Sequence, residues 1–316
     1  MITKEDAKTN DRYGTYPEKR TIAQLMDYGV INLDKPQGPT SHQAVAWLRD
    51  ILGTRKISHT GTIDPMVSGV LVVLLNESPK ATEVIGHEEK EYIALMHVHQ
   101  QFPKNIIENS VKKFVGKITQ LPPLRSAVAR RERVREIKEI ELLEINGKDV
   151  LFRVRCEAGT YIRRLIDDIG KDLKSKAHMA ELRRIRAGVF EEKDSFTMHN
   201  AKDAWDAYKE NGDESRLRKI IMPLEKVLDV VGVKKIIVKD SAVNKICNGA
   251  AVGVNGIAKL SDNIGKGETV VILTLKGEIV AVAAALMDSK AITKANRGIA
   301  ANTDRVLMKL NTYPYL

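Results

Sequence analysis

The stretch Ser58-His59-Thr60-Gly61-Thr62-Ile63-Asp64-Pro65-Met66-Val67-Ser68-Gly69 runs directly into the apolar residues 70–75. Two glycines therefore bracket an Asp-Pro pair just before a segment that predicts a buried strand. We expect this turn to hold Asp64 at the edge of a sheet, with its carboxylate facing a cleft. There a carboxylate can be a nucleophile, a general base, or only a turn-former, which is the usual role of Asp-Pro.

The segments around this stretch predict an irregular order of strands and helices. Residues 29–33 predict a short buried strand, and Thr40 or Ser41 caps a helix that Gly53 closes. Further strands are expected at residues 91–99 and 149–156, and further helices at 104–115 and 160–170. A mixed, mostly antiparallel central sheet with flanking helices fits this α+β order better than repeated βαβ units do.

The C-terminal part has a different composition. From Lys209 to Thr312 there is no Phe, Trp or Tyr, and short Val/Ile/Ala runs alternate with glycine turns. This pattern predicts a small β-barrel or sandwich after a boundary near residues 225–233. Residues 1–28 lack a clear period and predict an arm. We therefore expect an arm at 1–28, a larger domain at 29–230 and a small domain at 231–316.

The charge balance favours a polyanionic partner. Fifty-one Lys and Arg residues against 41 Asp and Glu give a net charge of +10, which suits nucleic acid or an acidic membrane surface. No apolar run approaches the ~18–20 residues that span a bilayer. Residues 1–20 contain no signal-peptide core, so we expect a cytoplasmic protein without a membrane partner.

Two arginines stand where the helix at 160–170 is expected to begin. Cations in a first helical turn oppose the helix dipole at a cost of about 0.3–1 kcal/mol, so Arg163 and Arg164 make most sense with an anion opposite them. The alternative is pairing along the helix, of Arg163 with Asp167 and of Arg164 with Asp168. Both arrangements can coexist if Arg164 pairs along the helix while Arg163 faces the cleft.

Arginines are densest in two segments. The first contains Arg125, Arg130, Arg131, Arg133 and Arg135, and the second contains Arg183, Arg184 and Arg186. A solvated charged face is the common explanation of a basic run, but Glu132 is the only acidic residue that interrupts the first cluster. The density favours bidentate contacts with the phosphates of a nucleic acid.

Signals for metals and cofactors are weak. Cys156 and Cys247 are far apart and form no CxxC pair, so neither a disulfide framework nor a Cys-based zinc site is expected. His97 and His99 face one side of a predicted strand, but no third ligand is evident nearby. The chain contains no GxxxxGK[ST] phosphate loop. We expect neither a metal nor a cofactor.

Several motifs in order resemble one enzyme family. Residues 34–42 (DKPQGPTSH), 59–65 (HTGTIDP), 90–92 (KEY) and 159–163 (GTYIR) occur as in the TruB-type RNA pseudouridine synthases. Residues 121–128 and 177–184 resemble the dyskerin branch, in particular its archaeal members, and residues 239–243 and 256–260 resemble that branch's PUA domain. The resemblance implies the pseudouridine synthase fold followed by a β-barrel-like PUA domain.

The resemblance also implies roles for individual residues in converting uridine to pseudouridine without a cofactor or metal. Asp64 matches the catalytic aspartate that is proposed to attack the ribose C1′, and Arg163 matches the arginine that pairs with it. Tyr92 matches the tyrosine that stacks on the flipped base. Tyr161 and Leu182 match residues that line the uracil pocket. His59 matches a histidine that helps hold the target nucleotide out of the stack.

In the dyskerin branch an H/ACA guide RNA pairs with the target, which implies rRNA or tRNA as substrate here. Residues 121–136 correspond to a thumb loop that closes over RNA, and residues 1–28 to an arm that packs on the PUA domain. The small domain is expected to contact RNA through Lys245, Lys259, Lys266 and Arg297. The implied protein partners are a small zinc-ribbon-type protein, a glycine-arginine-rich-type protein and a kink-turn-binding ribosomal-type protein. A stand-alone tRNA T-loop enzyme and a non-catalytic RNA scaffold remain alternatives.

Overall fold

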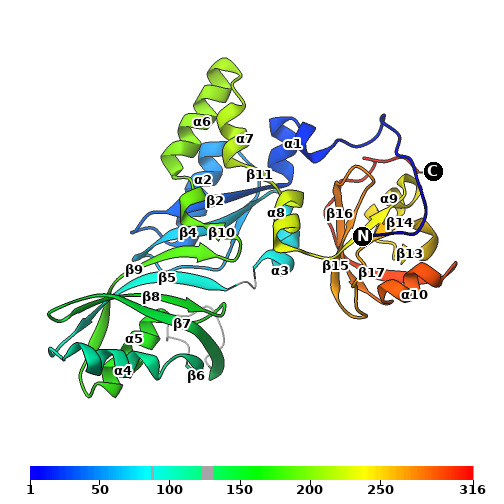
Figure 1. Ribbon diagram of the computed structural model, residues 1–316. Coiled ribbons are helices and arrows are strands. Elements are labelled where there is room, and N and C mark those ends of the chain that lie inside the picture. The colour runs from blue at the N-terminus through cyan, green and yellow to red at the C-terminus, as the bar shows by residue number, and fades with distance from the viewer. Residues whose placement is uncertain (87–88, 122–130, 316) are drawn as a thin grey trace.

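The strands gather into two sheets in the computed structural model, which describes residues 1–86, 89–121 and 131–315 (Figure 1). Within these residues, ten strands form a large sheet and seven form a small sheet. The main path of the large sheet is β11 (Met222–Pro223), β2 (Gly29–Lys35), β4 (Val67–Leu75), β9 (Ala177–Ala187), β5 (Lys90–Val98), β8 (Asp149–Cys156), β7 (Arg133–Asn146) and β6 (Gly116–Gln120). Off this path, β3 (Ile57–Thr60) pairs with β4, and β10 (Phe190–Glu191) pairs with β9.

The small sheet contains strands from both ends of the chain. Its order is β1 (Ile2–Thr3), β14 (Ile257–Leu260), β12 (Lys235–Val238), β15 (Thr269–Leu273), β16 (Ile279–Ala285), β17 (Ile299–Val306) and β13 (Val252–Gly253). The helices are α1 (Ile22–Asp27), α2 (Ser41–Leu52), α3 (Thr82–Ile85), α4 (Lys104–Lys112), α5 (Ile162–Asp172), α6 (Met198–Asn211), α7 (Ser215–Ile220), α8 (Leu224–Val231), α9 (Asp240–Cys247) and α10 (Ser289–Lys294). In the described part of the chain, no helix is long and apolar enough to cross a bilayer.

The expected α+β architecture is confirmed. Among the described strands of the large sheet, β4 and β9 pair parallel and the other neighbours pair antiparallel. The helix after Thr40 forms as predicted, because Thr40 and Gln43 make a reciprocal capping box and Gly53 ends the helix at φ +58°. Residues 22–27, which were expected to be part of an arm, form α1 instead, with a capping box at Thr21 and Gln24.

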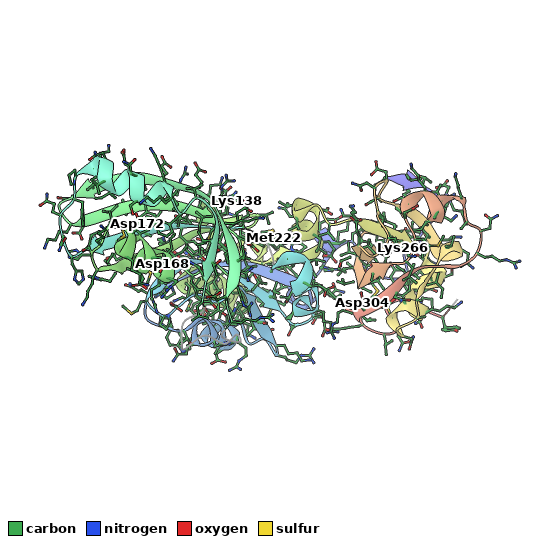
Figure 2. All side chains as sticks on the ribbon, turned by 90° about the horizontal axis from the view of Figure 1, so that it is seen from below. Lys138, Asp168, Asp172, Met222, Lys266 and Asp304 are labelled. Atoms are coloured by element: carbon green, nitrogen blue, oxygen red, sulfur yellow. The ribbon has the colours of Figure 1, made fainter. Side chains whose placement is uncertain are left out.

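From Val70 to Leu75, strand β4 is continuously apolar because it is buried on both faces. Leu71, Val73 and Leu75 pack into one core with side chains of α1, α2, α6 and α7. Val70, Val72 and Leu74 face a second core, which contains side chains of α8 and of the small sheet. A strand covered on both faces reads as a continuous apolar run rather than an alternation. Figure 1 shows α8 between the two sheets. Met222, which is labelled in Figure 2, begins the short strand β11 that directly precedes α8.

The first twenty residues cross from the small sheet to the large one. Ile2 pairs with Leu260, and the Arg20 guanidinium makes two hydrogen bonds to the Glu225 carboxylate, at 2.7 and 2.9 Å. Both side chains are almost fully buried, and Glu225 also accepts a bond from the backbone N–H of Ile279. This carboxylate therefore links the N-terminal segment, α8 and the small sheet.

Replacing Gly69 by alanine will separate β4 from β9 and lower the free energy of unfolding by about 3–4 kcal/mol. Gly69 has φ +102°, and a Cβ there would stand 2.2 Å from the carbonyl oxygen of Arg184 on β9. Denaturant unfolding measures the loss. Gly147→Ala is the matched control, because it has φ +60° and open space around a Cβ, and it should cost only about 1–2 kcal/mol. Equal losses in the two variants would contradict this explanation.

Candidate functional site

The Asp64 loop joins β3 to β4, and hydrogen bonds to its backbone fix its conformation. Gly61 takes φ +66°, and the Val67 N–H donates to the Asp64 carbonyl at 3.0 Å. The buried Ser41 hydroxyl donates to the carbonyl of Ile63 at 2.9 Å and accepts from its N–H at 3.0 Å. The residue before Asp64 is thus tied to the first turn of α2.

Lys35, which no sequence pattern singles out, also holds the Asp64 loop in place. Its fully buried amine donates to the carbonyls of Pro36 and Pro39 at 2.7 and 2.9 Å, and more weakly to that of Pro65 at 3.4 Å. Burial lowers the pKa of this amine, and the nearby Arg184 charge lowers it further. Lys35 therefore couples the turn at 36–39 to the loop that carries Asp64.

Asp64 and Arg163 meet across the site. An Nη2 of Arg163 donates to Oδ2 of Asp64 at 2.6 Å, and both side chains are 53% exposed. Arg164 instead pairs along α5, with Asp167 at 3.1 Å and Asp168 at 3.2 Å. The two arrangements considered from the sequence thus coexist. The carboxylate is held at the mouth of the site, where a solute can reach it.

Gln120, which no sequence pattern singles out, positions the start of α5. This buried side chain on β6 donates to the Tyr161 carbonyl at 3.1 Å and accepts from the Tyr161 N–H at 3.0 Å. Tyr161 is the N-cap residue of α5 and gives no side-chain cap to the helix. Gln120 therefore fixes the helix end from which Arg163 projects.

An apolar cluster forms the floor beside Asp64. Tyr92, Leu182, Ile63 and Ile162 belong to one buried core, and Tyr92 and Leu182 are each 8% exposed. Burial raises the pKa of the Tyr92 phenol, and the opposing effect of the neighbouring Arg184 is smaller. Tyr92 therefore keeps its proton at neutral pH.

The expectation that Arg184 contacts RNA is wrong. Its side chain is 1% exposed, because the guanidinium donates inward to the carbonyls of Val70 and Gly61 at 2.7 and 2.8 Å. Its neighbour Arg183 is partly exposed but is bound by Asp34 at 3.0 Å and by Glu192. Both arginines lie on β9, a strand that the basic composition of this segment concealed.

His59 lies next to the Asp64 loop without a hydrogen bond. Both ring nitrogens are buried and have no hydrogen-bond partner among the described residues. The ring packs edge-on against His42, with centroids 4.9 Å apart. Burial first, and then the His42 and Arg184 charges, lower the pKa of His59 to about 4. The imidazole is therefore neutral at physiological pH.

The other basic residues lie at several places on the surface. Arg125 and Arg130 fall outside the described residues. Arg131 is exposed, whereas Arg133 and Arg135 belong to β7 rather than to a loop, and Arg135 pairs with Glu157. Lys245, Lys259, Lys266 and Arg297 are all exposed. Lys266 lies between β14 and β15 and is labelled in Figure 2.

Comparison with known proteins places this site in a family. The model of the TruB family pseudouridylate synthase N-terminal domain matches residues 49–105 and 98–162, and that of the tRNA pseudouridylate synthase B C-terminal domain matches 163–229. A probable tRNA pseudouridine synthase B of Methanocaldococcus jannaschii is 51% identical over 314 residues, covering 99% of this chain and 93% of the relative. The chain belongs to the TruB family. It is an RNA pseudouridine synthase.

The remaining parts of this TruB-family enzyme also match known domains. The PUA domain model matches residues 234–307, which include most of the small sheet, and the DKCLD domain model matches residues 1–45. A probable tRNA pseudouridine synthase B of Methanosarcina barkeri is 47% identical, covering 99% of this chain and 92% of the relative.

Solved structures share the whole fold of this TruB-family enzyme. A chain in the crystal structure of the archaeal box H/ACA sRNP Nop10–Cbf5 complex is 45% identical with a TM-score of 0.87, covering 100% of this chain and 97% of that one. A chain in an H/ACA RNP bound to a substrate RNA containing 2′-deoxyuridine is 45% identical with a TM-score of 0.88, covering 99% and 96%.

His59 will make the enzyme less stable in mild acid. Its folded pKa of about 4 lies below the ordinary 6.5, so the unfolded state binds a proton that the folded state does not. The free energy of unfolding should fall by on the order of 1–3 kcal/mol as the pH is lowered from about 6.5 to 4. Denaturant unfolding of His59→Asn at several pH values should show a flatter decline. His199→Asn, at an exposed histidine, should keep the wild-type decline, and an unchanged decline in His59→Asn would contradict the assignment.

Proposed function

We propose that this enzyme isomerises specific uridines of rRNA, and also of the tRNA T-loop, with an H/ACA guide RNA choosing the target. The observation that carries the proposal is the contact between Asp64 and Arg163, 99 residues apart in sequence. This pair presents a half-exposed carboxylate above a closed apolar floor. A carboxylate so placed can reach a ribose while the base lies against the floor.

In the proposed reaction an Asp64 oxygen attacks the ribose C1′. The bond from C1′ to N1 breaks, and its electron pair leaves with the uracil. The base turns, and C5 bonds to C1′ as the carboxylate departs. The hydrogen on C5 is then lost as a proton, with the freed Asp64 carboxylate as acceptor or beside it, and N1 gains a proton. Nothing is oxidised or reduced, so the scheme needs no cofactor.

The base must leave its stack before C1′ becomes accessible. We assign Tyr92 to stacking on the flipped base, and Tyr161 and Leu182 to the uracil pocket. We assign His59 to holding the displaced nucleotide, because its ring lies beside the Asp64 loop and packs against His42. Arg163 orients the attacking carboxylate.

Base pairing with a guide would supply sequence specificity while the protein contacts backbone and shape. The small sheet suits this division, because residues 209–312 contain no aromatic ring on which a base could stack. We assign RNA contacts to the exposed Lys245, Lys259, Lys266 and Arg297.

The solved relatives support protein partners for this chain. Chains of the same fold are found in complexes that contain Nop10 and Gar1. We propose that this chain binds the corresponding small zinc-ribbon-type and glycine-arginine-rich-type proteins. A kink-turn-binding ribosomal-type protein would join the same assembly through the guide RNA.

A second candidate is a stand-alone enzyme that acts on the tRNA T-loop. The curated relatives favour it, because they are named probable tRNA pseudouridine synthases. The same Asp64 site serves either substrate, so only the requirement for a guide separates the two functions.

Asp64→Asn will reduce pseudouridine formation by at least about 10³-fold, because an amide cannot replace the nucleophile. Its affinity for RNA should stay within about threefold of wild type. The measurement is product formed in a labelled target RNA, with guide and partner proteins present or omitted. Asp50→Asn, an exposed aspartate on α2, is the matched control and should keep activity.

Each outcome of that experiment selects one function. Product that requires both the guide and Asp64 supports the guided enzyme. Product from bare tRNA alone favours the stand-alone enzyme. RNA binding by wild type without any product would leave a non-catalytic scaffold, and full activity of Asp64→Asn would remove the nucleophile assignment.

Replacing Arg131 and Arg133 together by alanine will weaken RNA binding and flatten its dependence on salt. Each lost phosphate contact should reduce the log–log salt slope by about 0.7–0.9. Filter binding across a salt series measures the slope. Arg153→Ala with Arg155→Ala is the control, because those arginines on β8 lie near glutamates of neighbouring segments. An unchanged slope in the first variant would contradict the RNA role.

A further inference from the structure

Three histidines meet at the ends of two neighbouring strands, away from the Asp64 site. His97 lies near the end of β5 and His99 directly follows that strand, and the register of β5 with β9 sets His97 directly opposite His178. The ring centroids are 5.2 Å apart for His97 and His178, 5.4 Å for His99 and His178, and 6.1 Å for His97 and His99. The local sequence pattern places His97 and His99 together but does not reveal His178, because strand β9 is not recognisable from its composition.

Two of the ring nitrogens already stand at the separation that a shared metal ion would impose. Nε2 of His99 lies 3.3 Å from Nδ1 of His178. An N–H···N contact of this length is at the long end for a hydrogen bond. Two nitrogens that each lie about 2.0–2.1 Å from one tetrahedral Zn²⁺ are about 3.3–3.4 Å apart. The observed spacing therefore matches one edge of a zinc tetrahedron.

A carboxylate orients the third histidine. Nδ1 of His97 lies 2.6 Å from Oδ1 of Asp149 on β8. Metal-binding histidines commonly hold a carboxylate on one ring nitrogen, which fixes the tautomer and leaves the other nitrogen as a lone-pair donor. Asp149 thus prepares Nε2 of His97 to bind an ion.

We propose that His97, His99 and His178 bind a divalent ion of the zinc class, with water or another ligand in a fourth position. With the side chains placed as they are, no group of three or more His, Cys, Asp or Glu residues in the described part of the chain can hold a metal ion, so binding requires the rings to rotate. The site closes when the exposed rings turn onto the ion, because His99 and His178 are exposed and His97 is about one-third exposed. The bound ion connects the C-terminal end of β5 to the N-terminal end of β9, two strands that are neighbours in the large sheet (Figure 1).

The two cysteines do not compete for such an ion. Burial raises the pKa of Cys156 to about 12 and that of Cys247 to about 11, so both thiols are protonated and covered. Imidazole nitrogens suit Zn²⁺, whereas Mg²⁺ prefers oxygen ligands. Zinc binding without magnesium binding is therefore the expected signature.

The test is titration of the full-length chain, purified without a histidine tag, with ZnCl₂ against a chromogenic chelator. We expect one ion per chain, at least tenfold weaker binding in His178→Gln, and roughly 10–100-fold weaker binding in Asp149→Asn. His199→Gln, at an exposed histidine outside the cluster, should bind as wild type does, and MgCl₂ should not compete.

Thermal unfolding without metal confirms that each variant is folded, and added ZnCl₂ should raise the unfolding midpoint of wild type but not of His178→Gln. Absence of a zinc complex in wild type, or equal affinities of His178→Gln and His199→Gln, would overturn the proposal. The titration contains no RNA, so its outcome does not depend on the proposed guided reaction.

Discussion

The candidate site depends on the buried guanidinium of Arg184. Burying a guanidinium is costly unless it finds hydrogen-bond acceptors, and Arg184 donates through Nε to the carbonyl of Val70 and through Nη2 to that of Gly61, on either side of the Asp64 loop. The same charge acts on Lys35, His59 and Tyr92. One buried side chain therefore fixes the path of the loop and sets the electrostatic environment of the groups around it.

The two sheets are joined by packing rather than by a free linker. Residues of β2, β4 and α8 share one buried apolar cluster with residues of β15, β16 and the segment after β17. The buried pair of Arg20 and Glu225 adds a bidentate contact at the same junction. An apolar interface of this kind favours a fixed arrangement of two domains over independent motion. The exposed face of the small sheet to which we assign RNA contacts is then held in a fixed position relative to the Asp64 site on the large sheet.

Local patterns of apolar and capping residues predicted many of the helices and strands of this fold. The alternating run at 149–156 is strand β8, and the signals around Thr40 and Gly53 mark both ends of α2. Strand β9 was hidden because its arginines make it look like a surface segment, although Arg184 is buried. Burial of a charge depends on tertiary partners, and no local pattern records them. For the same reason, the spacing of residues in the sequence did not predict the contact of Asp64 with Arg163. That prediction rested on the family resemblance and on the unfavourable position of a cation in the first turn of α5.

The pairing of β1 with β14 has a consequence for how the polypeptide is made. Ile2 pairs with Leu260, so the first strand is synthesised long before its neighbour exists. At about 5–20 residues per second, the ribosome needs roughly 13–50 s to cover that distance. Throughout this interval the arm has no edge to join, while the large sheet can already fold behind it. Closure of the arm onto the small sheet is therefore a late event, which cannot precede the synthesis of β14.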